Sequence, residues 1–211
     1  QSSVAWSTAG DGTFDNAAIV NATYTPGVND ITNGSVVLTL QSNATSPCTG
    51  FVTSNMTLTI VPAASANAGG NATICETGSY TLSGAIAANN AGVTWSSAGD
   101  GTFSPNNTTL NATYNPGPTD ITNGTVQLTL TATGNAPCGN AVSNMTLTLE
   151  AVPTVNAGGN GGACATGKIL TGSVGGSATG GIWSTPGDGT FNPNNTTLNV
   201  TYVSGPNDII N

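Results

Sequence analysis

One nine-residue string occurs three times in this chain of 211 residues, and its spacing limits what the chain can fold into. The copies lie at residues 6–14, 95–103 and 183–191, and each reads Trp-Ser-x-x-Gly-Asp-Gly-Thr-Phe. The three tryptophans stand 89 and 88 residues apart, and they are the only ones in the chain. A unit of about 90 residues can bury its own core, whereas shorter solenoid repeats need their neighbours for burial. The spacing therefore predicts tandem small domains.

The repeat phase predicts where these domains begin and end. Val61-Pro62 and Val152-Pro153 each open a short segment that closes on a Gly-Gly pair, which is typical of a linker of limited freedom. We expect residues 1–61 to form the C-terminal part of a first repeat, residues 62–152 a complete repeat, and residues 153–211 the N-terminal part of a third. The chain then reads as a segment of a longer one, and each incomplete repeat should expose an open sheet edge and half a core.

Apolar residues alternate with polar ones, which predicts strands. In the complete repeat we expect strands near residues 73–76, 79–84, 92–97, 101–103, 109–114, 125–133 and 142–150. Seven short strands between Gly, Pro and Asn turns, without helical periodicity, are typical of an immunoglobulin-like β-sandwich. The predicted fold class is all-β: tandem immunoglobulin-like β-sandwich domains of about 90 residues arranged end to end. The expected core aromatic residues are Trp6, Phe14, Trp95, Phe103, Trp183 and Phe191, with Asp100 exposed at the end of its sandwich.

The inventory of charged residues excludes several functions. Lys168 is the only basic residue and histidine is absent, against nine carboxylates and a net charge of −8. Such a chain cannot neutralise a row of phosphates, so we expect no nucleic-acid partner and no attraction to anionic membrane surfaces. No stretch approaches the 18 or more apolar residues of a membrane span, so we expect no insertion into a membrane. The commonest general base and zinc ligand are missing as well, and we expect no enzyme and no cofactor. On its strand Lys168 is interpreted as a solvated side chain rather than as part of an isopeptide crosslink.

The four cysteines fall into two classes by their position in the repeat. Cys75 and Cys164 come early in a unit, and Cys48 and Cys138 lie in the loop before its last strand. The favoured interpretation pairs Cys75 with Cys138 in a disulfide worth about 3 to 4 kcal/mol, with Cys48 and Cys164 paired outside the chain. The alternative pairs Cys48 with Cys75 and Cys138 with Cys164, across each linker. Either pattern, together with a charged content of only 5%, favours an extracellular or cell-surface location.

The acidic turns allow two interpretations. The aspartates of the Gly-Asp-Gly turns could meet a second aspartate at one end of each sandwich and bind calcium through oxygen ligands. Asp-Gly is also a favoured hairpin dipeptide, and Asn-Asp or Thr-Asp suits a turn, so a purely structural role is the stronger interpretation. The calcium candidates are Asp11, Asp30, Asp100, Asp120, Asp188 and Asp208.

Asn-x-Ser/Thr sequons recur at equivalent positions of the repeat. They are acceptor sequences for N-linked sugars, although duplication alone explains their recurrence. The candidate glycosylation sites are Asn21, Asn55, Asn111, Asn144 and Asn199.

Several motifs together resemble a known repeat. They are the Trp string, Leu-Asn-Ala-Thr-Tyr-Asn-Pro-Gly at 110–117, Asp-Ile-Thr-Asn-Gly-Thr-Val-Gln-Leu-Thr-Leu at 120–130, and the opening Asn-Ala-Gly-Gly-Asn-Ala-Thr-Ile-Cys-Glu at 67–76. They are similar to the Ig-like or PKD-like tandem repeats of giant Bacteroidota secreted or cell-surface proteins of the gliding-adhesin type. The resemblance implies extracellular sandwiches in long stalks or fibres and carries over no catalytic residue. The family often has acidic residues where this chain has Asn55 and Asn144, which weakens the case for calcium.

Two functions from different classes remain. The first is a structural or adhesive segment of a long extracellular stalk or filament, whose partners are neighbouring repeats of the same chain or other copies of it in a fibre. The second is a carbohydrate-binding accessory module of a secreted protein that contacts surface glycans. Sugar stacking needs exposed aromatic rings, and each Trp is better explained as a core residue.

Overall fold

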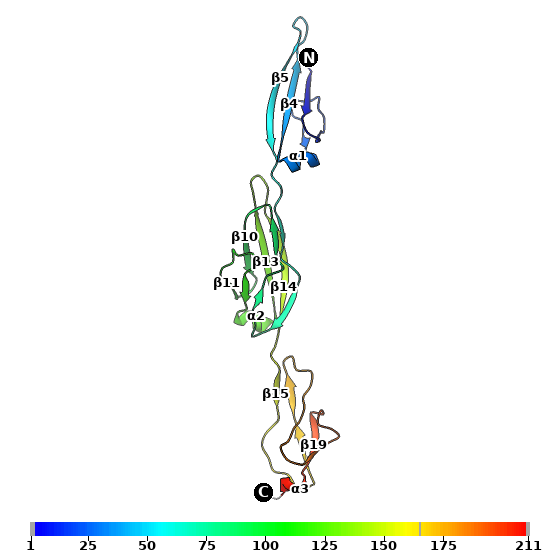
Figure 1. Ribbon diagram of the computed structural model, residues 1–211, viewed down its shortest axis with the longest axis vertical. Coiled ribbons are helices and arrows are strands. Elements are labelled where there is room, and N and C mark those ends of the chain that lie inside the picture. Colours follow the sequence, from blue (N-terminus) through cyan, green and yellow to red (C-terminus); the bar gives the residue numbers. More distant parts are fainter. Residues whose placement is uncertain (1–2, 165, 210–211) are drawn as a thin grey trace. The chain divides into compact units, whose positions relative to one another are not determined.

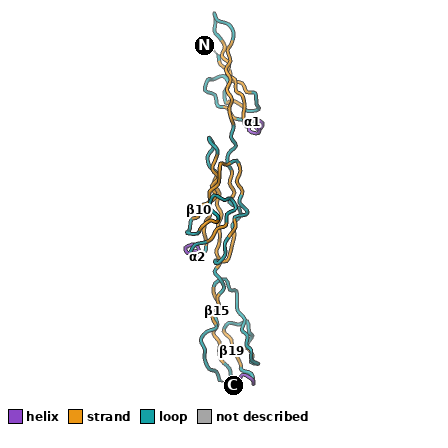
Figure 2. The backbone as a smooth tube through the Cα atoms, turned by 60° about the vertical axis from the view of Figure 1, so that its left-hand side comes forward, coloured by secondary structure: helices purple, strands orange, loops and turns teal. Residues whose placement is uncertain are grey.

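The computed structural model describes residues 3–164 and 166–209, in which short β-sheets are joined by turns and each of three short helices follows a strand (Figures 1 and 2). The predicted all-β, immunoglobulin-like sandwich class is confirmed. By compactness the chain divides into two units. One comprises residues 1–67, 85–94 and 130–143, and the other comprises residues 68–84, 95–129 and 144–211. The repeat boundaries at 61/62 and 152/153 stay a prediction.

The first sheet is built on one long hairpin. β4 pairs antiparallel with both β1 and β5, and the register places Trp6 opposite Leu40 and Leu38 opposite Met56. A small second sheet pairs β2 with β3, and the helix α1 follows β3. The elements are β1 (Val4–Thr8), β2 (Thr13–Phe14), β3 (Tyr24–Thr25), α1 (Val28–Asn33), β4 (Ser35–Asn43) and β5 (Phe51–Thr59).

The middle of the chain has the fullest set of strands. A four-stranded sheet has the order β10-β13-β14-β7, with β7 parallel to β14, and a three-stranded sheet has the order β11-β12-β8. Trp95 of β10 stacks on Phe103 of β11 with ring centroids 6.3 Å apart, so these strands face each other as in a sandwich. The elements are β6 (Ser65–Asn67), β7 (Ala72–Cys75), β8 (Tyr80–Thr81), β9 (Ile86–Ala88), β10 (Asn90–Ser97), β11 (Thr102–Ser104), β12 (Thr113–Asn115), α2 (Pro118–Asn123), β13 (Thr125–Gly134) and β14 (Ala141–Glu150).

The last part of the chain repeats this plan with fewer strands. β19 lies between β16 and β18, and β15 pairs with β17. Residues 180–185, which contain Trp183, form no strand, because no described segment pairs with them as β4 pairs with β1. The elements are β15 (Thr154–Asn156), β16 (Lys168–Thr171), β17 (Ser173–Gly175), β18 (Thr190–Asn192), β19 (Asn199–Val203) and α3 (Pro206–Ile209).

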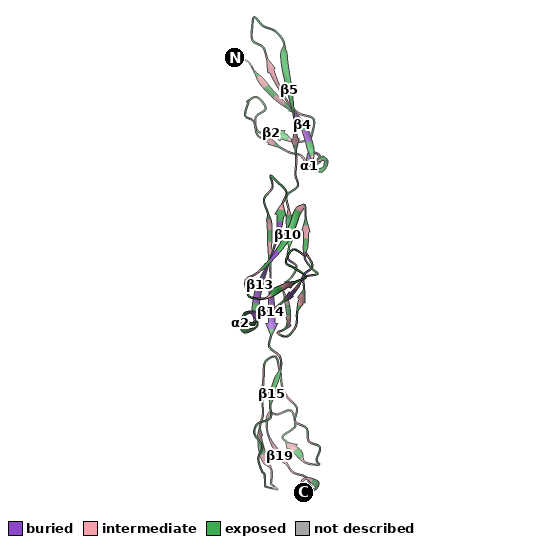
Figure 3. Ribbon diagram, turned by 90° about the vertical axis from the view of Figure 1, so that its left-hand side faces the viewer, coloured by how far each residue is buried: buried purple, intermediate pink, exposed green. Residues whose placement is uncertain are grey.

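The largest group of buried core residues in the described part of the chain lies along β13 and β14 (Figure 3). Alternate residues of both strands point inward. This alternation of buried and exposed residues is absent from β5, the strand of the first repeat that is equivalent to β14. Met145 of β14 is 2% exposed, whereas Met56 at the same position of β5 is 46% exposed. β14 lies between β13 and β7, but β5 is an edge strand. The buried residues of the two strands are Val126, Leu128, Leu130, Ala132, Met145, Leu147 and Leu149.

The expected core aromatic residues are only partly buried. Trp95 is 1% exposed and Asp100 is exposed, as predicted. Phe103 was expected to be buried and is half-buried, because it lies on the edge strand β11. The remaining four are also half-buried, since fewer strands cover them: Trp6, Phe14, Trp183 and Phe191.

All seven strands expected in the complete repeat are present, but three elements depart from the sequence analysis. β6 lies in the predicted linker and pairs with β9, which was not predicted. A strand of three residues offers too little alternation to be recognised. In place of a turn at Thr119-Asp120 the chain forms the helix α2, which is too short for helical periodicity and ends at Gly124, with φ of 68°.

Candidate functional site

Each Gly-Asp-Gly turn is tied to a short helix by two aspartates that cap each other's backbone. In the first copy the Asp11 carboxylate accepts the N–H groups of Asn29 at 3.0 Å and Asp30 at 3.2 Å, in the first turn of α1. The Asp30 carboxylate in return accepts the N–H groups of Asp11 at 3.3 Å and Gly12 at 3.1 Å. It also accepts the N–H of Gly27, the N-cap residue, at 3.0 Å. N–H groups of a first helical turn have no partner within the helix, so the Asp11 carboxylate satisfies donors that the helix leaves unpaired, while Asp30 holds the turn.

The second copy has the same arrangement in a more buried setting. Asp100 accepts the N–H groups of Thr119 at 3.1 Å and Asp120 at 3.3 Å. Asp120 accepts those of Gly101 at 3.1 Å and Gly117 at 3.0 Å, and its residue is only 1% exposed. In the third copy the N–H of Asn207 donates to Asp188 and the N–H of Gly205 donates to Asp208.

A tyrosine that was not among the residues predicted from the sequence completes each centre. Tyr114 donates its hydroxyl hydrogen to Asp120 at 2.6 Å, and the same hydroxyl is hydrogen-bonded to Ser97 at 2.6 Å. Each tyrosine stands six residues before the helix aspartate, so this fixed spacing was the signal available in the sequence. The other two sets are Thr8–Tyr24–Asp30 and Thr185–Tyr202–Asp208.

The hydrogen bonds shift the acid–base properties of these groups. Burial, and then the bond to Asp120, raise the pKa of Tyr114 to about 12. The Tyr24 hydroxyl is the main cause that lowers the pKa of Asp30, and the Tyr202 hydroxyl likewise lowers the pKa of Asp208. The first and third centres therefore favour an ionised aspartate, and the centre of the second copy keeps Tyr114 neutral to higher pH.

The glycines of the string recur because there is no room for a side chain. A Cβ atom at Gly99 would overlap the Asp120 carboxylate, and one at Gly101 would overlap the Tyr114 hydroxyl. A Cβ atom at Gly117 would overlap the Asp100 carboxylate. The repeated string is thus the set of residues that lets a turn, a helix and a tyrosine meet around two carboxylates.

The calcium interpretation does not fit this geometry. The paired candidates do meet, but as acceptors of N–H and O–H groups. Asp30 receives four donors, which matches the roughly four lone-pair sites of a carboxylate. Calcium takes six to eight oxygen ligands. Among the described residues no three His, Cys, Asp or Glu side chains gather as a metal site would need. This geometry supports a structural role for the centres, and calcium binding stays a prediction for Asp11, Asp30, Asp100, Asp120, Asp188 and Asp208.

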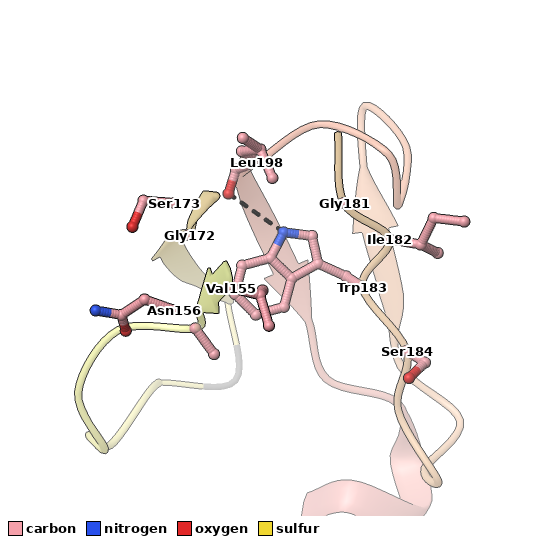
Figure 4. Close-up of a pocket in the computed structure, with 10 residues that line it drawn as sticks. Val155, Asn156, Gly172, Ser173, Gly181, Ile182, Trp183, Ser184 and Leu198 are labelled. Carbon is pink, nitrogen blue, oxygen red and sulfur yellow. Dashed lines mark hydrogen bonds between the residues drawn. The ribbon is translucent and has the colours of Figure 1, made fainter. Parts of the chain in front are cut away.

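A cavity of about 270 Å³ opens beside Trp183 (Figure 4). Its walls include Val155, Ile182 and Leu198. The indole N–H donates to the backbone oxygen of Leu198 at 3.2 Å, which is the bond that the buried Trp95 makes to Leu110 at 2.9 Å. The ring thus keeps the orientation of a core residue, although Trp183 is only half-buried.

The predicted disulfide is not formed. All four cysteines lie in the described part of the chain and carry free thiols. Cys75 pairs with Glu150 at the end of β14, whereas Cys138 precedes Ala141 at its beginning. A strand of ten residues spans about 30 Å, and a disulfide needs Cα atoms within about 7 Å. The Cys75–Cys138 pairing is therefore wrong, and neither bond of the alternative pairing, which involves Cys48 and Cys164, is present.

The remaining candidates lie on the surface. The five candidate acceptor asparagines, Asn21, Asn55, Asn111, Asn144 and Asn199, are all exposed, and their glycosylation stays a prediction. Lys168 begins β16 and is half-buried rather than fully solvated. No helix in the described part of the chain is long and apolar enough to cross a membrane.

Comparison with known proteins identifies no family. No family profile matches the sequence, and no curated protein is significantly similar to it. Solved structures with a similar arrangement include protocadherin gammaB7 EC3-6, with 12% identity over 97% of this chain and a TM-score of 0.47. Mouse cadherin-23 EC22-24 has 9% identity over 96% of this chain and a TM-score of 0.45. The extracellular domain of protocadherin gammaB4 has 14% identity over 97% of this chain and a TM-score of 0.44. The chain spans 60%, 75% and 40% of these three proteins, respectively.

Proposed function

We propose that this chain is a structural and adhesive segment of a long extracellular stalk or filament made of immunoglobulin-like repeats, with no catalysis of its own. One observation carries the proposal: the residues that recur most strictly are used to hold each repeat together. Asp100 and Asp120 bond backbone N–H groups, and the Tyr114 hydroxyl bonds Asp120. In a catalytic site at least one such group would face a substrate instead.

The surface chemistry supports a location outside the cell. Only 5% of the residues are charged, and many exposed strand positions carry Ser, Thr or Asn, beside exposed apolar residues such as Phe51 and Val155. The resemblance to giant Bacteroidota secreted and cell-surface proteins points the same way and makes other repeats of the same kind the main partners. Such a segment would set the distance between a cell surface and whatever lies at the end of the stalk.

Small-angle X-ray scattering of the whole chain tests the proposal. A compact globule of this length would have a radius of gyration of about 17 Å. A string of sandwiches should give a clearly larger value and a pair-distance distribution with a long tail. A compact, symmetric distribution would contradict the stalk proposal.

The cavity beside Trp183 favours one second candidate, a carbohydrate-binding module, because a half-buried indole can stack on a sugar ring. Titration of the chain with soluble polysaccharides, followed by tryptophan fluorescence, tests it. Binding that disappears in Trp183→Ala and persists in Trp6→Ala would support this candidate. Absence of any fluorescence change across neutral and acidic glycans would reject it.

A further inference from the structure

Two backbone positions, Val61 and Glu150, are equivalent in the repeat and lie at the two ends of the complete unit. Val61 lies five residues after Met56, and Glu150 lies five residues after the equivalent Met145. A short strand begins four residues later in each case, β6 after Val61 and β15 after Glu150. The same position therefore follows the last long strand of a repeat in both cases.

At Glu150 the early cysteine of the same repeat is the neighbour. Cys75, the last residue of β7, is the lateral partner of Glu150 in a parallel ladder, so their Cα atoms lie about 5 Å apart. The backbone N–H of the next residue, Glu76, donates to the backbone oxygen of Glu150 at 2.8 Å. The side-chain carboxylate of Glu76 accepts the backbone N–H of Val152 at 3.1 Å. Cys75 is thus fixed beside the chain that leads into the next repeat, and its thiol is exposed and free.

At Val61 the neighbour is the hairpin-loop cysteine of the following repeat. The Cys138 thiol donates to the backbone oxygen of Val61 at 3.2 Å, although the two residues are 77 positions apart. The equivalent loop cysteine of the first repeat, Cys48, has no preceding linker in the described residues and is exposed, whereas Cys138 is half-buried. The loop that carries Cys138 is therefore seated on the linker that enters its own repeat.

Placing the two observations on one repeat position brings the two classes of cysteine together. We propose that the early cysteine of each repeat forms a disulfide with the hairpin-loop cysteine of the repeat that follows it. Cys75 would pair with the loop cysteine of a completed third repeat, and Cys138 with the early cysteine of a completed first repeat. This pairing of cysteines differs from both pairings expected from the sequence. It joins none of the four cysteines of the chain to one another, and all four thiols are free in the structure.

The bond forms by thiol–disulfide exchange. The two thiols lose two protons and two electrons and gain one S–S bond, while one molecule of a small disulfide such as oxidised glutathione is reduced to two thiols. An oxidising extracellular compartment supplies such a disulfide. The inference goes beyond the proposed stalk function, since it concerns how consecutive repeats are joined covalently.

An extended chain tests the pairing. Asn211 is the repeat equivalent of Asn123, so a second copy of residues 124–152 added after Asn211 completes the third repeat and supplies a loop cysteine. After incubation with a glutathione redox buffer and alkylation of free thiols, non-reducing peptide mapping should show one disulfide, between Cys75 and the cysteine of the added copy. Cys48, Cys138 and Cys164 should be recovered alkylated. A Cys75–Cys138 bond, or a fully alkylated Cys75, would overturn the proposal.

Matched variants and a second extension guard against failure of the added segment to fold. Cys75→Ser should abolish the bond, whereas Cys164→Ser, the same substitution at the equivalent position of the third repeat, should leave it intact. Residues 62–89 added before Gln1 complete the first repeat instead, because Gln1 is equivalent to Asn90. In that chain the disulfide should link Cys138 to the added early cysteine. If both extensions give only alkylated thiols, the proposal is rejected.

Discussion

The hydroxyl of Tyr114 connects strand β10, which carries Trp95, to Asp120 of helix α2. It lies between Ser97 and Asp120, and Tyr114 is fully buried. No buried polar side-chain atom in the described part of the chain lacks a hydrogen-bond partner. Removing one member of such a centre leaves a charged acceptor without its donor, which costs more than the bond itself contributes.

Tyr114→Phe should lower the free energy of unfolding by about 2 kcal/mol, because the Asp120 carboxylate loses its O–H donor in a buried site. Tyr80→Phe is the matched control, since Tyr80 is the strand neighbour of Tyr114 and none of the observed side-chain hydrogen bonds involves its hydroxyl. The control should change stability by no more than about 0.5 kcal/mol. Urea unfolding followed by tryptophan fluorescence measures both, and equal losses in the two variants would contradict the role of the hydroxyl.

The raised pKa of Tyr114 predicts how stability depends on alkaline pH. The pKa is about 12 in the folded protein, against the ordinary value of 10.0, so below pH 10 both states keep the proton. Between these values the unfolded chain loses protons that the folded chain retains, and stability falls as pH rises. The free energy of unfolding should drop between about pH 10 and about pH 12, with a smaller drop in Tyr114→Phe. A steeper drop in the variant than in the parent chain would refute this assignment.

At acidic pH the dependence is the opposite, and stability falls as pH falls. The Tyr24 and Tyr202 hydroxyls lower the pKa of Asp30 and Asp208 below the ordinary value of 3.8. Their stabilising contribution is complete above that value and is lost as pH falls through the lower folded pKa. Thermal unfolding monitored by circular dichroism should show a midpoint that is constant from neutral pH to about pH 5 and decreases below about pH 4. Tyr24→Phe should flatten the decrease, and a midpoint that rises on acidification would be the opposite of what we expect.

At the scale of elements, each turn and its helix form one unit that neither could form alone. α2 has six residues and no side-chain cap of its own at Gly117, so it depends on the Asp100 carboxylate of the distant turn. Isolated helices of this length are not stable in water. Sequence patterns predicted the long strands β13 and β14, whose alternation extends over ten residues each. They could not predict α2, because a partner 19 positions away supplies its cap.

Gly99→Ala tests this unit. A Cβ atom there would overlap the Asp120 carboxylate and push it away from the turn, so we expect a loss of about 3 kcal/mol of stability. Gly92→Ala is the matched control, since Gly92 lies in β10 and a Cβ atom there meets nothing within 4 Å. The control should be neutral or slightly stabilising, because alanine has less conformational freedom to lose. Similar melting temperatures for the two variants would show that the turn tolerates a side chain.

At the scale of the whole molecule, the predicted and observed parts of the site differ in kind. The spacing of Trp6, Trp95 and Trp183 predicted the repeats, and the meeting of Asp100 with Asp120 was among the expectations. What the carboxylates do when they meet could not be read from the sequence, since a metal site and a set of caps require the same residue type. The direction of the N–H groups decides between them, and that is a property of the folded backbone.

The response of the protein to calcium follows from the direction of these N–H groups. Nine carboxylates and one lysine give the chain a net charge of −8, so calcium ions will gather near its surface. The centres, however, direct N–H and O–H groups at their carboxylates, and a cation would have to displace four donors at Asp30. The thermal midpoint in about 10 mM calcium should therefore equal that in EDTA at matched ionic strength. A specific site with a dissociation constant of about 1 mM would instead add about 1.4 kcal/mol and raise the midpoint by several degrees, which magnesium at the same concentration should not reproduce.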